Sequence, residues 1–545
     1  MPPEVRSQPC TRWSEMASTQ RESLSEEFEK RYDALAAIPG NTIGGGLKGV
    51  EKESLRIDMN GFLSQTPHPK ALGSALTNRF ITTDFSEALL EFVTPPLAST
   101  WETLGSMCDA HQFTYERLGR ELLWVTSMPC RAPDDVEIPL ARYGPSNVGQ
   151  MKTIYRRGLG YRYGRQMQTI AGVHFNYSLP DAFWPQYQKV CGDTRTESDF
   201  RSDHYLCLIR NFRRFGWLAL YLFGASPALC KSFTSGADVN LPSFSDDTYY
   251  EPFGTSLRMS DLGYTNQSQA RIAISLNSLD DYIADLSEAI RTPEPAYEEI
   301  GVKVGDVYRQ LNANRLQIEN EYYSSIRPKR VAKSGEHPTA ALRRGGIEYV
   351  EIRSLDINIF DPAGLNQNTM RFMEAFLIYC LLEDSPAFDD ESLAEANCNH
   401  SQTAKNGRDP TLRLHRGGAR VSLIKWAGEI LEKVAAVAAL IDRGEGSDSY
   451  GKAVNLMQSL VRHPDKTPSA RILEELRQAN TGFFEFALSV ANSHKNYFAS
   501  IAPLSDETKK ELQRETRDSL QRQRDVEAAD DISLDEYLAR YFDAE

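Results

Sequence analysis

The spacing of apolar residues divides the chain into three regions. In the first, residues 1–40, apolar positions recur at helical intervals from Leu24 to Ala36, directly after a capping-box sequence that starts at Ser23. This pattern predicts an amphipathic helix that stops at Pro39.

The second region, residues 41–362, has short β-type runs separated by glycine, proline and asparagine. We interpret this texture as an α+β region with a largely antiparallel sheet. The clearest predicted strands are 172–179, 270–276 and 346–357, and helical runs interrupt them at 101–123 and 203–222.

The third region, residues 363–545, is almost wholly helical in its pattern. Its clearest helical stripes are 421–443, 469–493 and 506–526, followed by a short last helix capped by Ser533. The most apolar stretch of the whole chain, 215–230, is shorter than a membrane span of ~20 residues and contains Gly224 and Pro227, so a buried element is expected.

Charge and cysteine content narrow the class of protein. Among 545 residues, 61 lysines and arginines stand against 75 acidic residues, a net charge of −14, and no basic run alternates with aromatic residues. A nucleic-acid partner is therefore not expected.

The 8 cysteines show no C-x-x-C spacing, which argues against a zinc site and a compact disulfide framework and favours reduced thiols. Because residues 1–20 resemble no secretory signal, a cytoplasmic protein without membrane attachment is expected.

Two glycine-rich segments resemble nucleotide-binding motifs. Residues 44–49 satisfy G-x-G-x-x-G, but the segment precedes a predicted strand instead of following one, so we favour a turn over a dinucleotide site. Residues 446–453 resemble a P-loop, but Ala453 stands where a hydroxyl should bind magnesium. We interpret this second segment as a loop between two helices.

Two carboxylates stand two residues apart in a β-rich run. If this run is a strand, Glu51 and Glu53 point from the same face. Like charges on one face are unfavourable without a cation. A solvated strand face is the alternative interpretation, and a metal site is the functional one.

A second acidic cluster lies in residues 83–95. Glu87 and Glu91 share a face in either a helix or a strand, and Asp84 lies close by in the sequence. An amphipathic surface face would give the same pattern. The cluster alone does not decide between a functional site and a solvated surface face.

Two further predicted strands carry ligand-type side chains on one face. His174, Asn176 and Ser178 alternate with apolar residues, and Glu351 and Arg353 are again two residues apart. A packed histidine and a mutually neutralising pair are the simpler explanations. A carboxylate for a metal beside an arginine for phosphate is, however, what phosphoryl transfer requires. Hard cations such as Mg²⁺ take oxygen ligands and leave positions open for phosphate. Basic and aromatic residues should then line the mouth of the site, and they are present in 155–159, 256–266 and 327–330.

Taken together, these segments resemble the proteobacterial type of glutamate–cysteine ligase (γ-glutamylcysteine synthetase). The resemblance runs in order through about residues 47–362, and the region before about residue 25 and residues 397–420 depart from it. The matching strings are 49–56, 81–95, 168–180, 223–227, 255–266, 316–321, 326–330 and 345–358.

The resemblance implies a glutamine-synthetase-like fold, in which a curved antiparallel sheet forms a funnel with flanking helices. It also implies domain limits at 1–40 (an N-terminal extension and helix), 41–362 (the catalytic α+β domain) and 363–545 (a mainly helical C-terminal region). Mg²⁺, with Mn²⁺ as a possible substitute, and the substrates ATP, L-glutamate and L-cysteine are expected, and the protein is expected to be a monomer.

The resemblance assigns roles to individual residues. Arg353 falls on a phosphate-contacting position, Arg258 and Arg156 are candidates for binding a substrate carboxylate, and Asp84 is a candidate proton acceptor. The metal positions are Glu51, Glu53, Asp84, Glu91, His174 and Glu351. The residues expected near the cysteine pocket are Phe85, Tyr155, Leu159, Gln168, Tyr264 and Tyr323.

The implied reaction activates a carboxylate that would not otherwise react with an amine. ATP phosphorylates the γ-carboxylate of glutamate, and the amine of cysteine then attacks the acyl phosphate to give γ-glutamylcysteine, ADP and phosphate, the first step of glutathione biosynthesis. Three alternatives stay open: a related ligase that uses a different amine, a metal-binding scaffold without catalysis, and a metal-dependent phosphohydrolase or nuclease.

Overall fold

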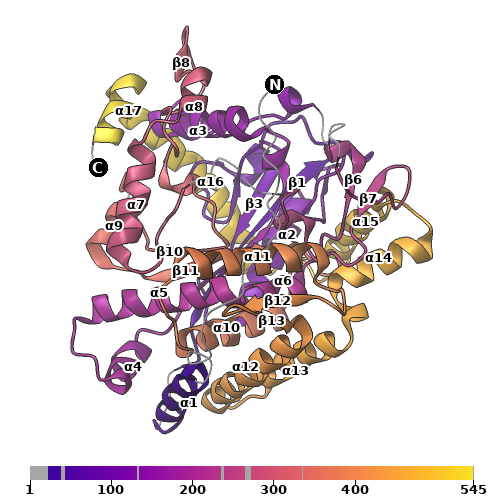
Figure 1. Cartoon of the computed structure of the whole chain (residues 1–545). Helices are drawn as coiled ribbons and strands as arrows, with labels where there is room; N and C mark the ends of the chain where they lie inside the picture. Colours follow the sequence, from indigo (N-terminus) through magenta and orange to yellow (C-terminus); the bar gives the residue numbers. More distant parts are fainter. Residues whose placement is uncertain are drawn as a thin grey trace.

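A seven-stranded antiparallel sheet forms the centre of the molecule (Figure 1). The computed structural model describes residues 23–38, 43–131, 134–234, 239–263, 272–333 and 335–543. The sheet has the order β10-β11-β5-β1-β3-β2, and β4 pairs with the end of β1. Its strands are β1 (Leu47–Ile57), β2 (Ile81–Thr83), β3 (Leu89–Val93), β4 (Leu122–Leu123), β5 (Val173–Ser178), β10 (Ile326–Lys329) and β11 (Tyr349–Leu355). The predicted α+β class with an antiparallel sheet is confirmed.

Alternation of side chains gives the sheet two different faces. In β5, Val173, Phe175 and Tyr177 are fully buried and point to one face, so His174 and Asn176 point to the other. The apolar face packs against helices, and the polar face carries the site described below.

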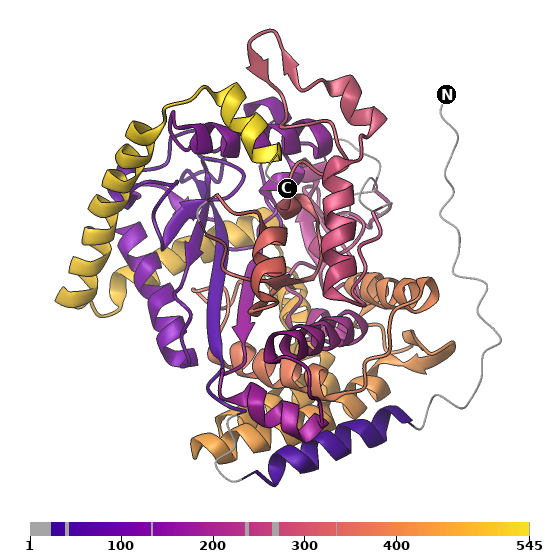
Figure 2. The same ribbon diagram turned by 90° about the vertical axis from the view of Figure 1, so that its left-hand side faces the viewer.

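The helix α10 (Gln367–Leu382) covers the apolar face of the sheet. It contributes Glu374, whose carboxylate accepts a hydrogen bond from Tyr177 of β5 and pairs with Lys48 of β1 at 2.7 Å. The helices α12 (Leu423–Glu445) and α13 (Ser449–Arg462) pack on α10 from outside, and α1 (Ser23–Ala36) lies beside α10 and α4 (Phe183–Cys191) (Figures 1 and 2).

Helices far apart in the sequence surround the rest of the sheet (Figure 2). On the β2 side, Glu515 of α16 pairs with Arg79 at 2.8 Å. These helices are α2 (Thr100–Tyr115), α3 (Asn147–Tyr163), α4 (Phe183–Cys191), α5 (Glu197–Phe215), α6 (Trp217–Phe223), α7 (Leu279–Arg291), α8 (Pro295–Ile300), α9 (Pro338–Gly345), α11 (Asp390–Asn406), α14 (Pro468–Ala479), α15 (Phe483–Ser500), α16 (Asp506–Ala529) and α17 (Leu534–Asp543).

Three small hairpins lie outside the main sheet. They are β6 (Ala228–Cys230) with β7 (Thr248–Tyr250), β8 (Lys303–Val304) with β9 (Val307–Tyr308), and β12 (Arg413–Arg416) with β13 (Ala419–Ser422). The last hairpin interrupts a region that the sequence predicts to be helical, and it overlaps the segment 397–420 where the family resemblance fails.

Most predicted elements are confirmed, and the errors have local causes. The stripe 469–493 is two helices, because Asn480 adopts a left-handed conformation (φ 48°) that ends α14. The run 101–123 leaves its helix after Tyr115 and continues into β4. The predicted strand 270–276 is wrong over 272–276, where the chain is irregular, and its first two residues lie outside the described residues.

Both glycine-rich segments behave as structural turns. Residues 44–46 lead directly into β1, and residues 446–448 connect α12 to α13.

The prediction that the apolar stretch 215–230 is a buried element is also confirmed, since every residue of α6 and β6 is buried. In the part of the chain that the structure describes, no helix combines the length and the apolar character that a membrane span requires.

The expectation that all cysteines are reduced is wrong for one pair. Cys130 and Cys230 form a disulfide with their Cα atoms 5.4 Å apart. The two residues are separated by 100 positions in the sequence, so no spacing motif could reveal the pair. Five other described cysteines are not disulfide-bonded.

Candidate active site

Three neighbouring strands, β1, β5 and β11, place the central polar side chains. Glu51 of β1 lies directly opposite His174 of β5, and Asn176 of β5 lies opposite Glu351 of β11. Because side chains alternate along each strand, these four residues all point from the polar face. The backbone register therefore brings together residues that are up to 300 positions apart.

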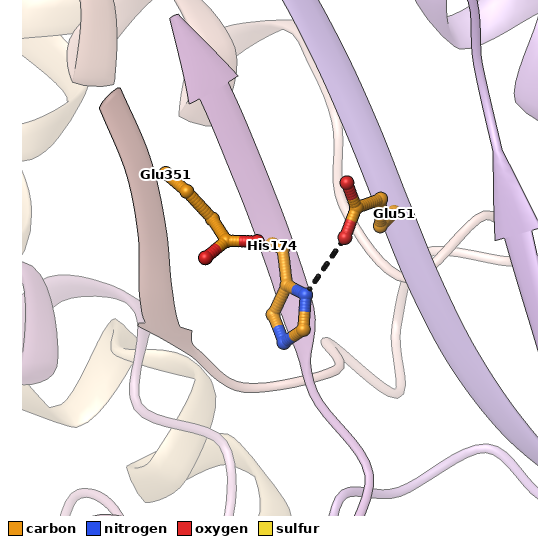
Figure 3. Close-up of side chains that lie close together, drawn as sticks. All are labelled: Glu51, His174 and Glu351. Carbon is orange, nitrogen blue, oxygen red and sulfur yellow. Dashed lines mark hydrogen bonds and ion pairs between the residues drawn. The ribbon is translucent and has the colours of Figure 1, made fainter. Parts of the chain in front are cut away.

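Glu51, His174 and Glu351 form the tightest group of possible metal ligands among the described residues (Figure 3). One ligand atom from each lies within 4.8 Å of the others. The Nδ1 atom of His174 lies 3.0 Å from Oε2 of Glu51, and the amide of Asn176 donates to Oε1 of Glu51 at 2.8 Å. The hydrogen bond from His174 holds the pKa of Glu51 below its usual value, although burial acts in the opposite direction.

The second carboxylate of β1 faces the other ring nitrogen of the histidine. Oε1 of Glu53 lies 3.8 Å from Nε2 of His174, while Oε2 of Glu53 accepts a hydrogen bond from the backbone of Gly172 at 2.6 Å. If Nδ1–H donates to Glu51, Nε2 of a neutral imidazole has a lone pair that faces a carboxylate oxygen. Two acceptors in this arrangement require a proton or a metal cation between them.

Asp84 and Glu91 extend the acidic group towards the β2 side of the sheet. Glu91 of β3 is the register partner of Glu53, and Asp84 directly follows β2. Burial, together with the charges of Glu51, Asp84 and Glu53, raises the pKa of Glu91 well above its usual value. Burial also raises the pKa of Glu53. The cluster is therefore electrostatically strained without a cation.

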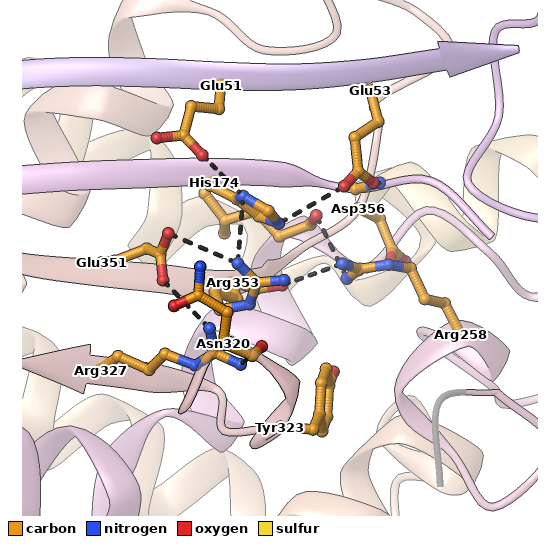
Figure 4. A network of polar contacts seen from close by, with 12 residues as sticks. Glu51, Glu53, His174, Arg258, Asn320, Tyr323, Arg327, Glu351, Arg353 and Asp356 are labelled. Carbon is orange, nitrogen blue, oxygen red and sulfur yellow. Dashed lines mark hydrogen bonds and ion pairs between the residues drawn. The ribbon is translucent and has the colours of Figure 1, made fainter. Parts of the chain in front are cut away.

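Three cations lie around Glu351 on the opposite side of the group, and Figure 4 shows two of them, Arg327 and Arg353. Oε1 of Glu351 is 3.4 Å from both Nζ of Lys329 and the guanidinium of Arg353, and Oε2 is 4.0 Å from Arg327. These charges hold the pKa of Glu351 well below its usual value despite burial. Its buried Oε2 atom has no hydrogen-bond donor. The site thus has an acidic half and a basic half.

Arg258 lies beside Arg353, in contact with the end of β11. Its guanidinium donates to the backbone carbonyl of Arg353 at 2.9 Å and lies 3.6 Å from the carboxylate of Asp356 (Figure 4). The side chains of Arg258 and Asp356 are 5% and 0% exposed.

The residues expected near the cysteine pocket lie on several elements beside this face. Tyr155 and Leu159 are on α3, and Gln168 is buried in the turn before β5. Phe85 is fully buried in the main core, and the hydroxyl of Tyr323 lies 3.3 Å from the sulfur of Met259. Tyr264 lies outside the described residues.

Arg156 of α3 connects this neighbourhood to the acidic cluster. Its Nε donates to the backbone carbonyl of Asp84, and its guanidinium lies 4.6 Å from the ring centre of Tyr143. The same guanidinium is one of the charges that lower the pKa of Glu91.

The predicted shared face of Glu87 and Glu91 is wrong. Glu87 lies in the turn before β3, where its carboxylate accepts a hydrogen bond from the backbone of Arg142 at 2.7 Å.

The sequence predicted that Arg327 and Lys329 line the mouth of a site but gave them no individual role, and it did not identify Asp356. The paired spacing of Arg327 and Lys329 on one strand is the signal that could have identified the first two.

Comparisons with known proteins give a consistent result. A family model described as "Glutamate-cysteine ligase" matches residues 36–403. The chain is 50% identical over 523 residues to the glutamate–cysteine ligase of Alcanivorax borkumensis, with 95% of this chain and 99% of that protein covered. It is 46% identical over 519 residues to the glutamate–cysteine ligase of Pseudomonas putida, covering 95% of this chain and 98% of that protein.

Solved structures agree with the sequence comparisons. The glutamate–cysteine ligase of Francisella tularensis, crystallised in complex with AMP, superposes with a TM-score of 0.86 at 36% identity and covers 92% of this chain and 98% of that chain. A bifunctional glutathione synthetase from Pasteurella multocida has the same fold, with a TM-score of 0.69 at 23% identity over 87% of this chain and 55% of that chain.

Proposed function

This chain belongs to the glutamate–cysteine ligase family, and we propose that the polar face of its sheet is the catalytic site of that reaction. The enzyme joins the γ-carboxylate of L-glutamate to the amine of L-cysteine with ATP, and it forms γ-glutamylcysteine, ADP and phosphate. The observation that carries the assignment of the site is the meeting of Glu51, His174 and Glu351 beside Arg353.

The acidic half of the site suits Mg²⁺, or Mn²⁺ in its place. Hard cations prefer carboxylate oxygens, and two features fit such an ion: the buried Oε2 of Glu351 without a donor, and the opposed acceptors of His174 and Glu53. We assign Glu51, Glu53, Asp84, Glu91, His174 and Glu351 as the residues that would hold it. A bound divalent cation would neutralise negative charge on the phosphates of ATP.

The basic half suits the phosphates themselves. Arg353, Lys329 and Arg327 come from adjacent strands and all face Glu351. Once Glu351 is neutralised by a cation, these three side chains are free to contact phosphate oxygens. Arg353 then stabilises the charge that develops on the transferred phosphoryl group. In phosphoryl-transfer enzymes such a group raises the rate by ~10³-fold or more.

Glutamate must lie where its γ-carboxylate reaches the phosphoryl group. Arg258 is bonded to the backbone of Arg353, so a carboxylate held by Arg258 lies next to the phosphoryl-contacting residue. We therefore assign the carboxylate bound by Arg258 to glutamate. Arg156 lies on the other side, beyond Asp84, and we assign it to the carboxylate of cysteine.

The amine of cysteine must lose a proton before it attacks the acyl phosphate. Asp84 is assigned as the proton acceptor because it lies between Arg156 and the carboxylates of the metal cluster. The cysteine pocket is assigned to Phe85, Tyr155, Leu159, Gln168, Tyr264 and Tyr323.

Several properties of the whole protein belong to the same proposal. We propose a monomer located in the cytoplasm that binds neither nucleic acid nor membranes. We also retain the division into an N-terminal extension and helix (1–40), a catalytic domain (41–362) and a helical C-terminal region (363–545).

One assay tests the proposed function. ADP formation is measured with ATP, Mg²⁺ and glutamate, together with cysteine, 2-aminobutyrate or ammonia, and the product is identified by mass spectrometry. Cysteine should support the fastest ADP release and yield γ-glutamylcysteine. Faster ADP release with 2-aminobutyrate or ammonia than with cysteine would instead support the alternative of a related ligase with a different amine.

A further inference from the structure

The side chain of Arg258 is held by the backbone of an irregular strand end. Between Ile352 and Leu355, β11 has one residue more than the facing segment of β5, which is a β-bulge. The guanidinium of Arg258 donates to the carbonyl of Arg353 inside the bulge at 2.9 Å and to that of Leu355 at 3.4 Å. Two backbone carbonyls of this irregular strand end therefore hold the guanidinium.

Neighbouring atoms leave the guanidinium of Arg258 few other positions. A Cβ atom at Gly172 would lie 2.1 Å from Nη2 of Arg258, so only glycine permits the observed placement of the guanidinium. Arg258 itself is 4% exposed, and its Nε has no hydrogen-bond partner. A buried arginine that retains an unused donor is suited to receive a further anionic group.

Asp356 supplies the fixed negative charge behind Arg258. Its Oδ2 accepts hydrogen bonds from the backbone of Ala225 at 2.8 Å and from the hydroxyl of Ser226 at 2.6 Å. Its Oδ1 accepts from the hydroxyl of Ser256 at 3.0 Å and lies 3.6 Å from the guanidinium of Arg258. Donors from two other segments therefore fix the carboxylate independently of the arginine.

We propose that Asp356 is a positioning residue that orients Arg258 for the carboxylate of glutamate. Asp356 joins three pieces of chain, namely the end of β11, the turn at Ser226 and the turn at Ser256 that precedes Arg258. It sets the direction of the guanidinium without contacting substrate. This inference rests on the proposed role of Arg258 and adds the residue on which that role depends.

The charge of Asp356 is the relevant property. Asp356→Asn keeps the shape of the side chain but removes the negative charge that faces Arg258. Glutamate binding should weaken by about tenfold, the size expected if the misdirected guanidinium of Arg258 loses one charge-assisted hydrogen bond to the substrate carboxylate. The turnover number should change by less than about threefold, because Arg353 and the acidic cluster are not touched.

A double-mutant cycle with Arg258→Ala tests the inference. Glutamate KM and kcat are measured for the wild type, for each single variant and for the double variant, all with Mg²⁺, ATP and cysteine at saturation. Asp356→Asn should raise KM in the wild-type background and should have almost no effect in the Arg258→Ala background. Equal effects in both backgrounds would overturn the positioning role.

The outcomes separate this inference from the proposed function. If Arg258→Ala leaves glutamate KM unchanged, the assignment of Arg258 itself fails. If Arg258→Ala raises KM but Asp356→Asn does not, only the role of Asp356 fails. Asp361→Asn is the matched control, because Asp361 is a neighbouring, half-buried carboxylate that bonds Asn358 and Asn366 and should leave KM unchanged.

A second variant covers the case in which Asp356→Asn does not fold. Ser256→Ala removes the hydroxyl that holds Oδ1, the oxygen nearest Arg258, and leaves the carboxylate in place. Glutamate KM should rise by about two- to fivefold with kcat retained. An unchanged KM in a folded Ser256→Ala protein would contradict the inference.

Discussion

Glu51 and His174 face each other across two neighbouring strands, with Oε2 of the carboxylate 3.0 Å from Nδ1 of the ring. They are direct register partners of β1 and β5, so their separation is fixed by backbone hydrogen bonds of the sheet. A slip of one residue in either strand would turn that strand's side chain to the apolar face and separate the pair. The site is therefore as rigid as the strand pairing that supports it.

Glu351→Gln should remove most of the binding of divalent cations. The variant keeps the size of the side chain but loses a charged oxygen that has no hydrogen-bond donor in the structure. The affinity for Mn²⁺ should fall by about a hundredfold, and ligase activity should fall at least as far. Isothermal titration with Mn²⁺ measures the affinity directly.

Glu348→Gln is the matched control for this variant. Glu348 lies just before β11, but its carboxylate faces Arg330 at 3.7 Å and is 39% exposed. Both Mn²⁺ affinity and activity should stay near the wild-type values. Unchanged Mn²⁺ binding in Glu351→Gln would remove Glu351 from the set of metal ligands.

Arg353→Ala should lower turnover far more than it weakens glutamate binding. The guanidinium lies beside Glu351 and His174, where the transferred phosphoryl group is proposed to lie. We expect kcat to fall by about 10³-fold, whereas glutamate KM changes by only a few fold. Steady-state kinetics with glutamate as the varied substrate separates the two effects.

The exposed Arg344, which pairs with Glu336 at 2.7 Å, provides a control arginine. Arg344→Ala should retain normal kinetics. A loss of glutamate binding in Arg353→Ala that matches its loss of turnover would mean that Arg353 binds substrate and does not act on the phosphoryl group.

The sequence could predict which side chains of the site share a face. Within one strand the alternation is strict, so the pairs Glu51 with Glu53 and Glu351 with Arg353 follow from spacing alone. The same argument failed for Glu87, because it assumes that the element continues, and the chain turns between Ser86 and Leu89.

Contacts between distant segments could not be predicted in this way. The strand order that places β5 between β1 and β11 depends on packing of the whole chain. The contact of Arg258 with Arg353 depends on a bulge, and nothing in the local sequence pattern indicates an extra residue in β11. For the same reason the Cys130–Cys230 disulfide was not foreseen.

Loss of this disulfide should destabilise the protein. Cys130 and Cys230 are both buried and close a loop of 100 residues, which restricts the unfolded chain. A Cys130→Ser, Cys230→Ser variant should lose about 2–4 kcal/mol of the free energy of unfolding. Urea unfolding under non-reducing conditions measures this loss.

A variant of a cysteine outside the disulfide controls for the substitution itself. Cys398→Ser, at a half-buried cysteine that is not disulfide-bonded, should have a much smaller effect. Peptide mapping by mass spectrometry without reduction should recover Cys130 and Cys230 in one linked fragment. Alkylation of both thiols in the folded protein would contradict the disulfide.

A buried lysine on the apolar face of β1 should make stability depend on pH. Lys52 is 3% exposed, and its Nζ lies 2.8 Å from Nε2 of His111. Nδ1 of this ring is 2.8 Å from the carbonyl of Met107, so Nε2 is the acceptor. Burial is the largest influence on the pKa of Lys52, and the thiol of Cys108 opposes it. Burial lowers the pKa of Lys52 to about 7.

The sign of this pH dependence follows from the protonation of Lys52 in the folded and the unfolded protein. In the unfolded chain the pKa of Lys52 is 10.5, so between about pH 7 and that value folding releases a proton. The free energy of unfolding therefore rises with pH in this window, by at most about 1.4 kcal/mol per pH unit. Below about pH 7 Lys52 is protonated in both the folded and the unfolded protein, and the stability gained from its deprotonation is lost.

Lys52→Met should remove this slope. Between about pH 7 and about pH 9, the wild type should gain about 2 kcal/mol more than the variant, as measured by urea unfolding at each pH. The slope is the informative quantity, because the variant also leaves Nε2 of His111 without its donor, which shifts stability at every pH. Lys466→Met, at an exposed position, should keep the wild-type slope. If Lys52→Met keeps it too, Lys52 is charged in the folded protein and its ammonium has a partner that compensates for burial.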